Sequence, residues 1–270
     1  MNNQFQLLKL SRFLPLFITQ FLGAFNDNFY KNALLIMVSY NLITSPHSSL
    51  IIVNLASGLF ILPFFLFSAL AGKLSDKYNK AKLIVALKYW ELFIMLFAIV
   101  GFYFNNLYLL LLVLFGLGTQ SAFFGPLKYS ILPQHLNQQE LVGGNALIES
   151  GTFVAILLGT LGAGFLLSYQ FNFPVYIILS ILLIFFAFIG ILSAYKIPSA
   201  PSFNPGLAIN LNIFSQSWEI INLARQTRPV WLSILGISWF WFIGASLLAQ
   251  FPILVKSVLN APPGVVSLFL

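Results

Sequence analysis

Cysteine is absent from this 270-residue chain, and charged residues are scarce. Without cysteine there is no disulfide framework, no thiolate metal ligand and no thiol nucleophile. Asp, Glu, Lys and Arg make up 7% of the residues, against roughly 25% in an average soluble domain. Hydrophobic residues make up 59%, with 30 phenylalanines. These values exclude an ordinary soluble domain and indicate a membrane protein.

Sequence patterns typical of enzymes are also lacking. We find no His/Cys metal cluster, no glycine-rich phosphate loop and no serine-elbow motif, so we predict no metal, no cofactor and no catalytic centre. His135 and Glu140 have nearly the spacing of the His-x4-Asp motif of glycerolipid acyltransferases, in which histidine deprotonates an acceptor hydroxyl. This pair lies in a short loop, with no soluble domain to build an acyl pocket. We therefore predict that the chain is not an enzyme.

Apolar runs long enough to cross a bilayer recur along the chain, where a helical span needs about 20 residues. We predict seven complete spans, at residues 13–40, 50–71, 83–104, 107–127, 143–168, 173–195 and 229–250. The first run is too long for a signal-peptide core, so we expect it to be retained. An eighth apolar run begins near Val265 and is cut off at Leu270, so we expect a truncated chain.

Basic residues fall almost entirely on one side of this seven-span layout. That side carries Lys9, Arg12, Lys73, Lys77, Lys80, Lys82, Lys88, Lys128, Lys196, Arg225 and Arg228. Only Lys256 falls on the other side, and Lys31 lies within a span. Because basic loops resist translocation, we predict a cytoplasmic N-terminus. The net charge of +7 is then a signal of topology, and we predict no nucleic-acid partner because the cations form no single patch.

One long polar segment, residues 196–228, interrupts the spans. It begins with the Pro- and Ser-rich stretch "IPSAPSFNPG". Apolar residues then recur among polar ones at Ile209, Ile213, Trp218, Ile220, Ile221 and Leu223, which predicts a short helix in the cytoplasmic interface. Six spans before a linker and a new span after it are typical of a transporter built from two related halves. A generic polytopic protein with one long loop is the alternative.

The loop between the second and third predicted spans, "GKLSDKYNKAKLI", carries a more specific pattern. We predict a tight turn at Gly72 and a helix that restarts at about Lys82. The loop resembles that of the major facilitator superfamily, and the matching positions are Gly72, Leu74, Asp76, Lys77 and Lys80. The resemblance implies an all-α helical bundle of that type, with an N-terminal six-span half at 1–195, a linker at 196–228 and the start of a second half at 229–270.

The same resemblance implies that this loop acts as a conformational latch, carried here by Gly72, Asp76, Lys77 and Lys80. Asn79 stands where the family has glycine, and asparagine tolerates positive φ better than most residues. Ala81 replaces a basic residue. The alternative is an ordinary cytoplasmic loop whose lysines serve only topology.

The first predicted span contains polar residues. Inserting an ionised side chain at the centre of a membrane costs at least about 2.5 kcal/mol of free energy, so such residues usually face a cavity or a partner. Asp27 and Lys31 are four residues apart and share a helical face on which they can partly neutralise each other. Gln20 and Gly23 extend that face into a wall of a water-accessible path. Hydrogen-bonding asparagines flank it at Asn26, Asn28 and Asn32. The alternative is a set of contacts that serves only helix assembly.

The fifth predicted span repeats this spacing with Asn145 and Glu149, and Lys128 is a plausible counter-ion for Glu149. We assign Glu149 either a lipid-headgroup or proton role, or structural pairing. Small residues recur every fourth position at Gly151, Ala155, Gly159 and Ala163, which predicts close packing of another helix. Glu91 and Lys88 are expected to pair near the interface in a structural role.

Three blocks are more specific still: "RFLPLFITQFLGAFNDNFYKNAL", "FGPLKYSILPQHL" and "LVGGNALIESGTF". They resemble the bacterial lysophospholipid transporter branch, including the transporter half of fusions to an acyltransferase. The resemblance implies a multi-pass protein of the bacterial inner membrane that moves a lysophospholipid or similar amphipathic substrate, with a fused or separate acyltransferase as partner. Asp27, Lys31, Gln20, Asn26, Asn145 and Glu149 are then the candidate substrate-binding residues. The alternatives are a proton-coupled exporter of small molecules, a membrane anchor for a catalytic domain, or an inactive fragment.

Overall fold

Helices form almost all of the ordered structure in the computed structural model, which describes residues 4–42, 46–169, 172, 174–209, 212–262 and 265. The long helices are α1 (Leu14–Met37), α2 (Pro46–Lys77), α3 (Lys80–Tyr103), α4 (Leu107–Ser130), α6 (Gln138–Ser168), α7 (Val175–Ala194) and α9 (Arg228–Ser257). The shorter elements are η1 (Gln4–Lys9), η2 (Val38–Leu42), α5 (Leu132–His135) and α8 (Ile213–Arg225). The prediction of an all-α polytopic membrane protein is confirmed.

Six of the seven predicted spans correspond to described helices that are long and apolar enough to cross a membrane: α2, α3, α4 with α5, α6, α7 and α9. The first predicted span corresponds to α1, which is of similar length but carries several polar residues. The predicted eighth span lies outside the described residues, apart from Val265.

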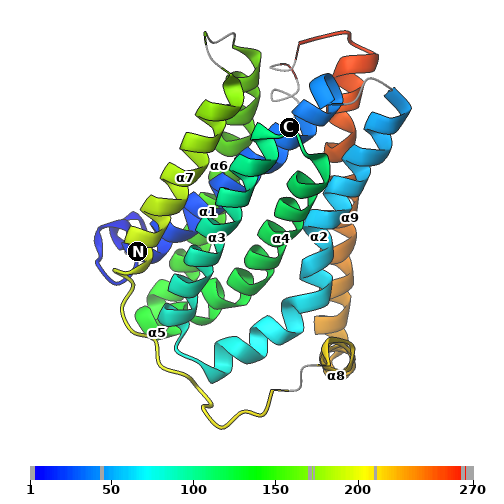
Figure 1. Ribbon diagram of the computed structural model, residues 1–270. Coiled ribbons are helices and arrows are strands. Elements are labelled where there is room, and N and C mark those ends of the chain that lie inside the picture. The colour runs from blue at the N-terminus through cyan, green and yellow to red at the C-terminus, as the bar shows by residue number, and fades with distance from the viewer. Residues whose placement is uncertain are drawn as a thin grey trace.

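α1 is the central helix of the bundle. It packs mainly against α6 and α7, while α2 packs against α4, and α3 bridges α4 and α7. Figure 1 shows α7 on one side of the bundle and α9 on the other, where α9 lies against α2. Most of the residues of α1 are buried, so neighbouring helices, not lipid, surround its polar side chains.

The small-residue ladder of α6 lies against α1, as predicted. A Cβ atom on Gly159 would lie 2.5 Å from the Phe25 carbonyl oxygen and 3.0 Å from the Phe29 nitrogen. Ala155 and Ala163 are fully buried on the same face. The absence of larger side chains therefore lets two helix backbones approach closely.

The structure corrects the prediction for the loop between the second and third spans. α2 continues through Gly72 to Lys77 instead of turning at Gly72, and α3 begins at Lys80, before the predicted restart. Asn79 has φ −64°, so it does not occupy the left-handed region. Its side chain instead accepts a hydrogen bond of 3.2 Å from the Lys82 N–H and caps α3.

The segment after α7 returns to this loop and then forms a helix. The Lys80 N–H donates to the Ala200 carbonyl (2.9 Å), and the Phe203 and Asn204 N–H groups donate to the Asp76 carbonyl (3.0 and 3.1 Å). The helix expected in the segment is α8, whose Phe214, Trp218, Ile220 and Leu223 side chains are exposed. Its position in the membrane interface and the division into three regions stay predictions.

Candidate functional site

A line of polar side chains runs between α1, α4 and α6, and we call it the polar stripe. It consists of Gln20, Asp27 and Lys31 on α1, Ser121 and Lys128 on α4, and Glu149 and Thr152 on α6. α1 and α4 touch each other much less than either touches its main neighbour. The stripe therefore lies along α1 and α4 where these two helices make few direct contacts.

At one end of the stripe, Gln20 joins α1 to α6. The Thr152 hydroxyl donates to Gln20 Oε1 (2.8 Å), and Gln20 Nε2 donates to the Ile148 carbonyl (3.3 Å). Lys128 Nζ on α4 lies 3.5 Å from Thr152 Oγ1. Three helices thus meet through one hydroxyl, with the amine of Lys128 half-buried beside it.

Asp27 forms the middle of the stripe. Its side chain is buried, and the Ser121 hydroxyl of α4 donates a short hydrogen bond to Oδ2. The other carboxylate oxygen, Oδ1, has no hydrogen-bond partner within the described part of the chain. One acceptor of this buried carboxyl group therefore has no partner among the described residues.

Lys31 does not form a close ion pair with Asp27, although the two charges interact electrostatically. Its amine instead donates to Asn28 Oδ1 (3.0 Å) and lies 5.4 Å from the centre of the Phe60 ring of α2. The predicted shared face holds for these two residues, but each charge has its own neighbours. Asp27 therefore meets α4 and Lys31 meets α2, although both lie on α1.

Two of the predicted flanking asparagines bind neighbouring helices. Asn26 is fully buried and donates to Glu91 Oε1 (3.1 Å) and to the Leu183 carbonyl (3.2 Å). Asn32 donates to Thr160 Oγ1 (2.7 Å) on α6. In this structure both amides fix α1 to its neighbours, and a substrate-binding role for Asn26 stays a prediction.

The predicted pair of Lys88 and Glu91 forms, with Nζ and Oε2 2.5 Å apart, and it is enclosed by the protein. Its position near the membrane interface stays a prediction. The Lys88 side chain is 1% exposed and that of Glu91 0%. Room for Lys88 comes from two glycines: a Cβ on Gly23 would lie 3.0 Å from its Nζ, and one on Gly190 would lie 2.9 Å from its Cε. Gly23 therefore faces this ion pair, not the polar stripe.

On α6, the candidates Asn145 and Glu149 are half-buried. Asn145 donates to the Leu141 carbonyl of its own helix (2.8 Å). Glu149 interacts electrostatically with Lys128, the counter-ion expected for it. The stripe thus contains two carboxylates, Asp27 and Glu149, and two amines, Lys31 and Lys128.

The sequence interpretation missed Ser121. The only signal was a polar run, "TQS", inside the apolar fourth span, at Thr119, Gln120 and Ser121. Gln120 is also buried, and its Oε1 lies 3.3 Å from the Ser121 hydroxyl. Nothing in the sequence indicated that Ser121 would meet Asp27, because the two residues lie on different helices.

The latch candidates lie at the end of the bundle where α2 meets α3. Asp76 is exposed, Lys77 lies 5.8 Å from the Tyr78 ring centre, and Gly72 is helical. Lys80 is fully buried, and its Nζ lies 4.3 Å from the centre of the Phe203 ring in the linker. Among the described residues, the loop between α2 and α3 therefore packs against the linker, through Lys80 and Phe203.

The acyltransferase-like residues do not form a catalytic pair. Arg12 forms an ion pair of 2.8 Å with Glu140 and donates to the His135 carbonyl (2.6 Å). Glu140 also accepts from the Asn137 N–H (2.9 Å), completing a capping box at the start of α6. Glu140 thus ties α6 to the segment before α1, and it does not orient His135.

Comparisons with known proteins identify the family. A model described as Major Facilitator Superfamily matches residues 16–270. The lysophospholipid transporter LplT of Serratia proteamaculans (strain 568) is 28% identical over 232 residues, which cover 84% of this chain and 54% of that protein. LplT of Escherichia coli (strain SE11) is 27% identical over 252 residues, covering 85% of this chain and 54% of that protein.

The chain spans about half the length of these curated relatives. Because the family model covers nearly the whole chain, and the helices have the length and apolar character of membrane spans, this chain belongs to the Major Facilitator Superfamily.

Proposed function

We propose that this chain is part of a transporter that moves lysophospholipids, such as lysophosphatidylethanolamine, across the bacterial cytoplasmic membrane toward the cytoplasmic leaflet. The observation that carries the proposal is the polar stripe, with two carboxylates and two amines inside a mainly apolar bundle whose other buried charges, Lys88 and Glu91, pair with each other. The similarity to proteins named lysophospholipid transporters supports the same substrate class. A fused or separate acyltransferase that reacylates the lipid is the proposed partner.

The arrangement of charge suits a zwitterionic headgroup. Asp27 offers an unpartnered carboxylate oxygen to an ammonium, and a charge-assisted hydrogen bond of this kind is stronger than a neutral one. Lys31 and Lys128 lie on either side of Asp27 along the stripe and offer amines to a phosphate. Gln20 and Glu149 complete the set of proposed headgroup contacts. Asn145 would join them only if its amide broke the hydrogen bond to the Leu141 carbonyl.

The loop between α2 and α3 is proposed as the conformational latch, with Gly72, Asp76, Lys77 and Lys80 as its residues. The exposed carboxylate of Asp76 and the linker contacts of its carbonyl support a role in coupling this loop to movements of the bundle. We further propose that the end carrying this loop is cytoplasmic, which places the N-terminus on the cytoplasmic side.

The test is uptake of labelled lysophosphatidylethanolamine into spheroplasts or oriented vesicles that contain the full gene product. Asp27→Asn should lower the initial rate about tenfold or more, since a hydrogen bond to a charged group contributes roughly 1.5–3 kcal/mol. Membrane abundance should stay unchanged. The matched control is Glu219→Gln, the same type of change at an exposed carboxylate of α8. Equal uptake by Asp27→Asn and the parent protein would reject the role of Asp27.

A proton-coupled exporter is the second candidate, because the same buried carboxylate could carry a proton. In that case efflux of small molecules would depend steeply on pH and would collapse with an uncoupler. Lysophospholipid uptake that persists with an uncoupler present would exclude this alternative.

A further inference from the structure

The first part of the linker is bound closely to the bundle along residues 197–204, and we call these residues the strap. Ile197 and Ala200 are buried in the same apolar cluster as Ile84 of α3. The Ala200 carbonyl accepts the hydrogen bond of the Lys80 N–H (2.9 Å). The strap is therefore packed into the end of the bundle, although its sequence is that of a loop.

Further hydrogen bonds tie the strap to three elements. At the start of α3, Asn79 Nδ2 donates to Ser199 Oγ (2.9 Å). In α5, Gln134 Nε2 donates to the Pro201 carbonyl (3.1 Å). At the end of α2, the Asp76 carbonyl accepts two backbone N–H groups of the strap, at 3.0 and 3.1 Å. The strap thus joins the ends of α2, α3 and α5 to the chain that leaves α7.

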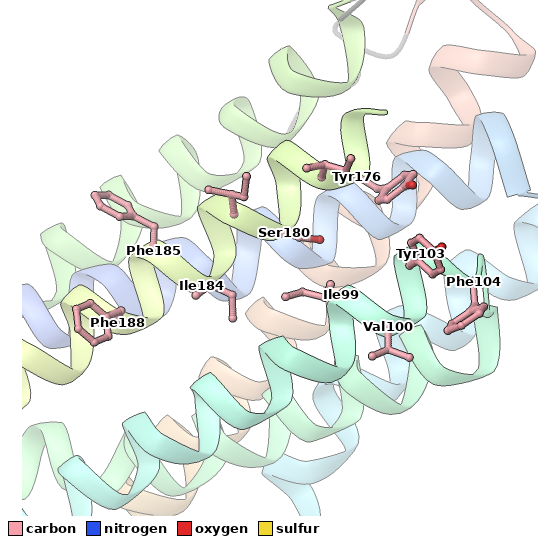
Figure 2. Close-up of a pocket in the computed structure, with 11 residues that line it drawn as sticks. Ile99, Val100, Tyr103, Phe104, Tyr176, Ser180, Ile184, Phe185 and Phe188 are labelled. Atoms are coloured by element: carbon pink, nitrogen blue, oxygen red, sulfur yellow. The ribbon is translucent and has the colours of Figure 1, made fainter. Parts of the chain in front are cut away.

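The same end is where α3 and α7 meet through polar side chains. The hydroxyls of Tyr89 on α3 and Tyr195, just after α7, lie 2.8 Å apart. Toward the other end, an apolar groove of about 770 Å³ lies between the two helices, with Val100 and Ile184 in its lining (Figure 2). Direct packing of α3 on α7 is incomplete along the groove, so the strap secures the pair at one end.

The next residues, 205–212, are held much less. They begin with Pro205 and Gly206, which are exposed. Among the described residues 205–209, the backbone hydrogen bond is local: the Leu207 N–H donates to the Asn204 carbonyl (3.2 Å). No hydrogen bond of these described residues reaches a helix of the bundle. A weakly held segment therefore separates the strap from α8.

α8 and α9 are joined more tightly to each other. Only Gln226 and Thr227 lie between them, and two residues span at most about 7 Å. The Trp231 N–H of α9 donates to the Thr227 carbonyl (3.0 Å), and the Arg225 guanidinium of α8 lies 4.9 Å from the centre of the Trp231 ring. Figure 1 shows α8 end-on at the foot of α9. The two helices must therefore move together at this junction.

α8 packs on α2 through a weak interface. Its ion pair of Glu219 with Lys73 is exposed, and such pairs contribute little to stability. Gln216 is 1% exposed, yet neither polar atom of its amide has a partner among the described residues, which costs free energy. Among the described residues of α9, only Val255 is buried, at the end far from α8. α8 and the adjoining end of α9 are thus held less firmly than the strap.

We propose that the strap is a fixed part of the bundle, and that α8 and α9 swing together about a joint at residues 205–212. In the structure α8 is docked on α2. In the second state α8 leaves α2, and the Gln216 amide gains hydrogen-bond partners. The strap keeps the loop between α2 and α3 with the bundle in both states. This movement does not depend on which substrate is transported.

Distances between spin labels test the joint in lipid nanodiscs that contain the full gene product. Tyr108→Cys, at an exposed site at the far end of the bundle, is the reference. Paired with Ser202→Cys in the strap, it should give one narrow distance. Paired with Leu223→Cys in α8, it should give a second distance as well. Leu223→Cys paired with Phe242→Cys on α9 should again give one, because α8 and α9 move together.

Amide hydrogen exchange in the same nanodiscs tests the strap with a matched pair of variants. Ala200 is fully buried and Ala208 is exposed. Ala200→Leu overpacks the strap and should raise exchange at the Phe203 and Asn204 amides about tenfold. Ala208→Leu, the same change within the joint, should leave these amides protected.

Three results would overturn the proposal. One is a strap label with as many distances as the α8 label. Another is a single narrow distance for the α8 label both with and without lysophosphatidylethanolamine. The third is equal exchange of the strap amides in the two alanine variants, because the strap would then not be packed into the bundle.

Discussion

At the scale of single residues, the polar groups of α1 have two separate roles. Asn26 and Asn32 use their amides on α3, α7 and α6, so they hold the helix in place. Asp27 instead meets Ser121 of α4, Gln20 binds α6, and Lys31 lies over Phe60 of α2. The free-energy cost of burying the Asn26 and Asn32 amides in the membrane is offset by their hydrogen bonds. Asp27, in contrast, has one carboxylate oxygen without a partner among the described residues.

The ion pair of Lys88 and Glu91 gives a prediction about stability. Glu91→Gln removes the charge next to a lysine that is 1% exposed. Losing one partner of a buried pair costs about 3–5 kcal/mol, so we expect a large fall in the free energy of unfolding. The measurement is denaturant unfolding in detergent, followed by tryptophan fluorescence.

Glu219→Gln is the control for this prediction, since Glu219 pairs with Lys73 but is 70% exposed. An exposed pair contributes about 1 kcal/mol or less. The double variant Lys88→Met, Glu91→Leu should recover most of the lost stability, because apolar residues can replace a buried pair. If Glu91→Gln were no less stable than Glu219→Gln, the pair would not be isolated from water as the structure shows.

At the scale of helices, the close contact of α1 and α6 depends on glycine. Gly159→Ala places a Cβ 2.5 Å from the Phe25 carbonyl oxygen, so the two helices must separate. Overpacking of this kind costs about 1–3 kcal/mol. We expect a lower unfolding midpoint. We also expect a weaker hydrogen bond between Thr152 and Gln20, because these two residues meet across the same interface.

Gly58→Ala is the matched control, because a Cβ there has nothing within 4 Å. Alanine favours a helix over glycine by up to about 1 kcal/mol, so this variant should be as stable as the parent or more stable. The two alanine variants should therefore shift the midpoint in opposite directions. A midpoint of Gly159→Ala as high as that of Gly58→Ala would contradict the close approach of α1 and α6.

The sequence predicted these helices better than their ends and contacts. Long apolar runs and the four-residue ladder of α6 predict spans and one packing face, because both depend on local spacing. The continuation of α2 through Gly72 was not predictable, since its last turns bind a linker that lies far along the chain. The burial of Lys88 and the contact of Ser121 with Asp27 likewise depend on which helices become neighbours, and the sequence of one helix does not determine that.

At the scale of the whole molecule, basic residues gather at one end. The loop between α2 and α3, α5 and α8 lie at the same end of the bundle, opposite the turn between α3 and α4 (Figure 1). Lys73, Lys77, Lys128 and Arg225 belong to this end. Lys88 was counted with them, but it is sequestered by Glu91 and contributes little to a surface charge.

The orientation of the bundle can be tested directly, because the chain has no cysteine that would give background labelling. Gln226→Cys marks the basic end, just after α8, and Tyr108→Cys marks the other end, where the tyrosine is 86% exposed. Since basic loops stay in the cytoplasm, a membrane-impermeant maleimide should label Tyr108→Cys in intact cells. It should label Gln226→Cys only after the membrane is opened. The reverse labelling pattern would show the opposite orientation, with the basic end outside the cytoplasm. The polar stripe would then have to accept its headgroup from the other leaflet.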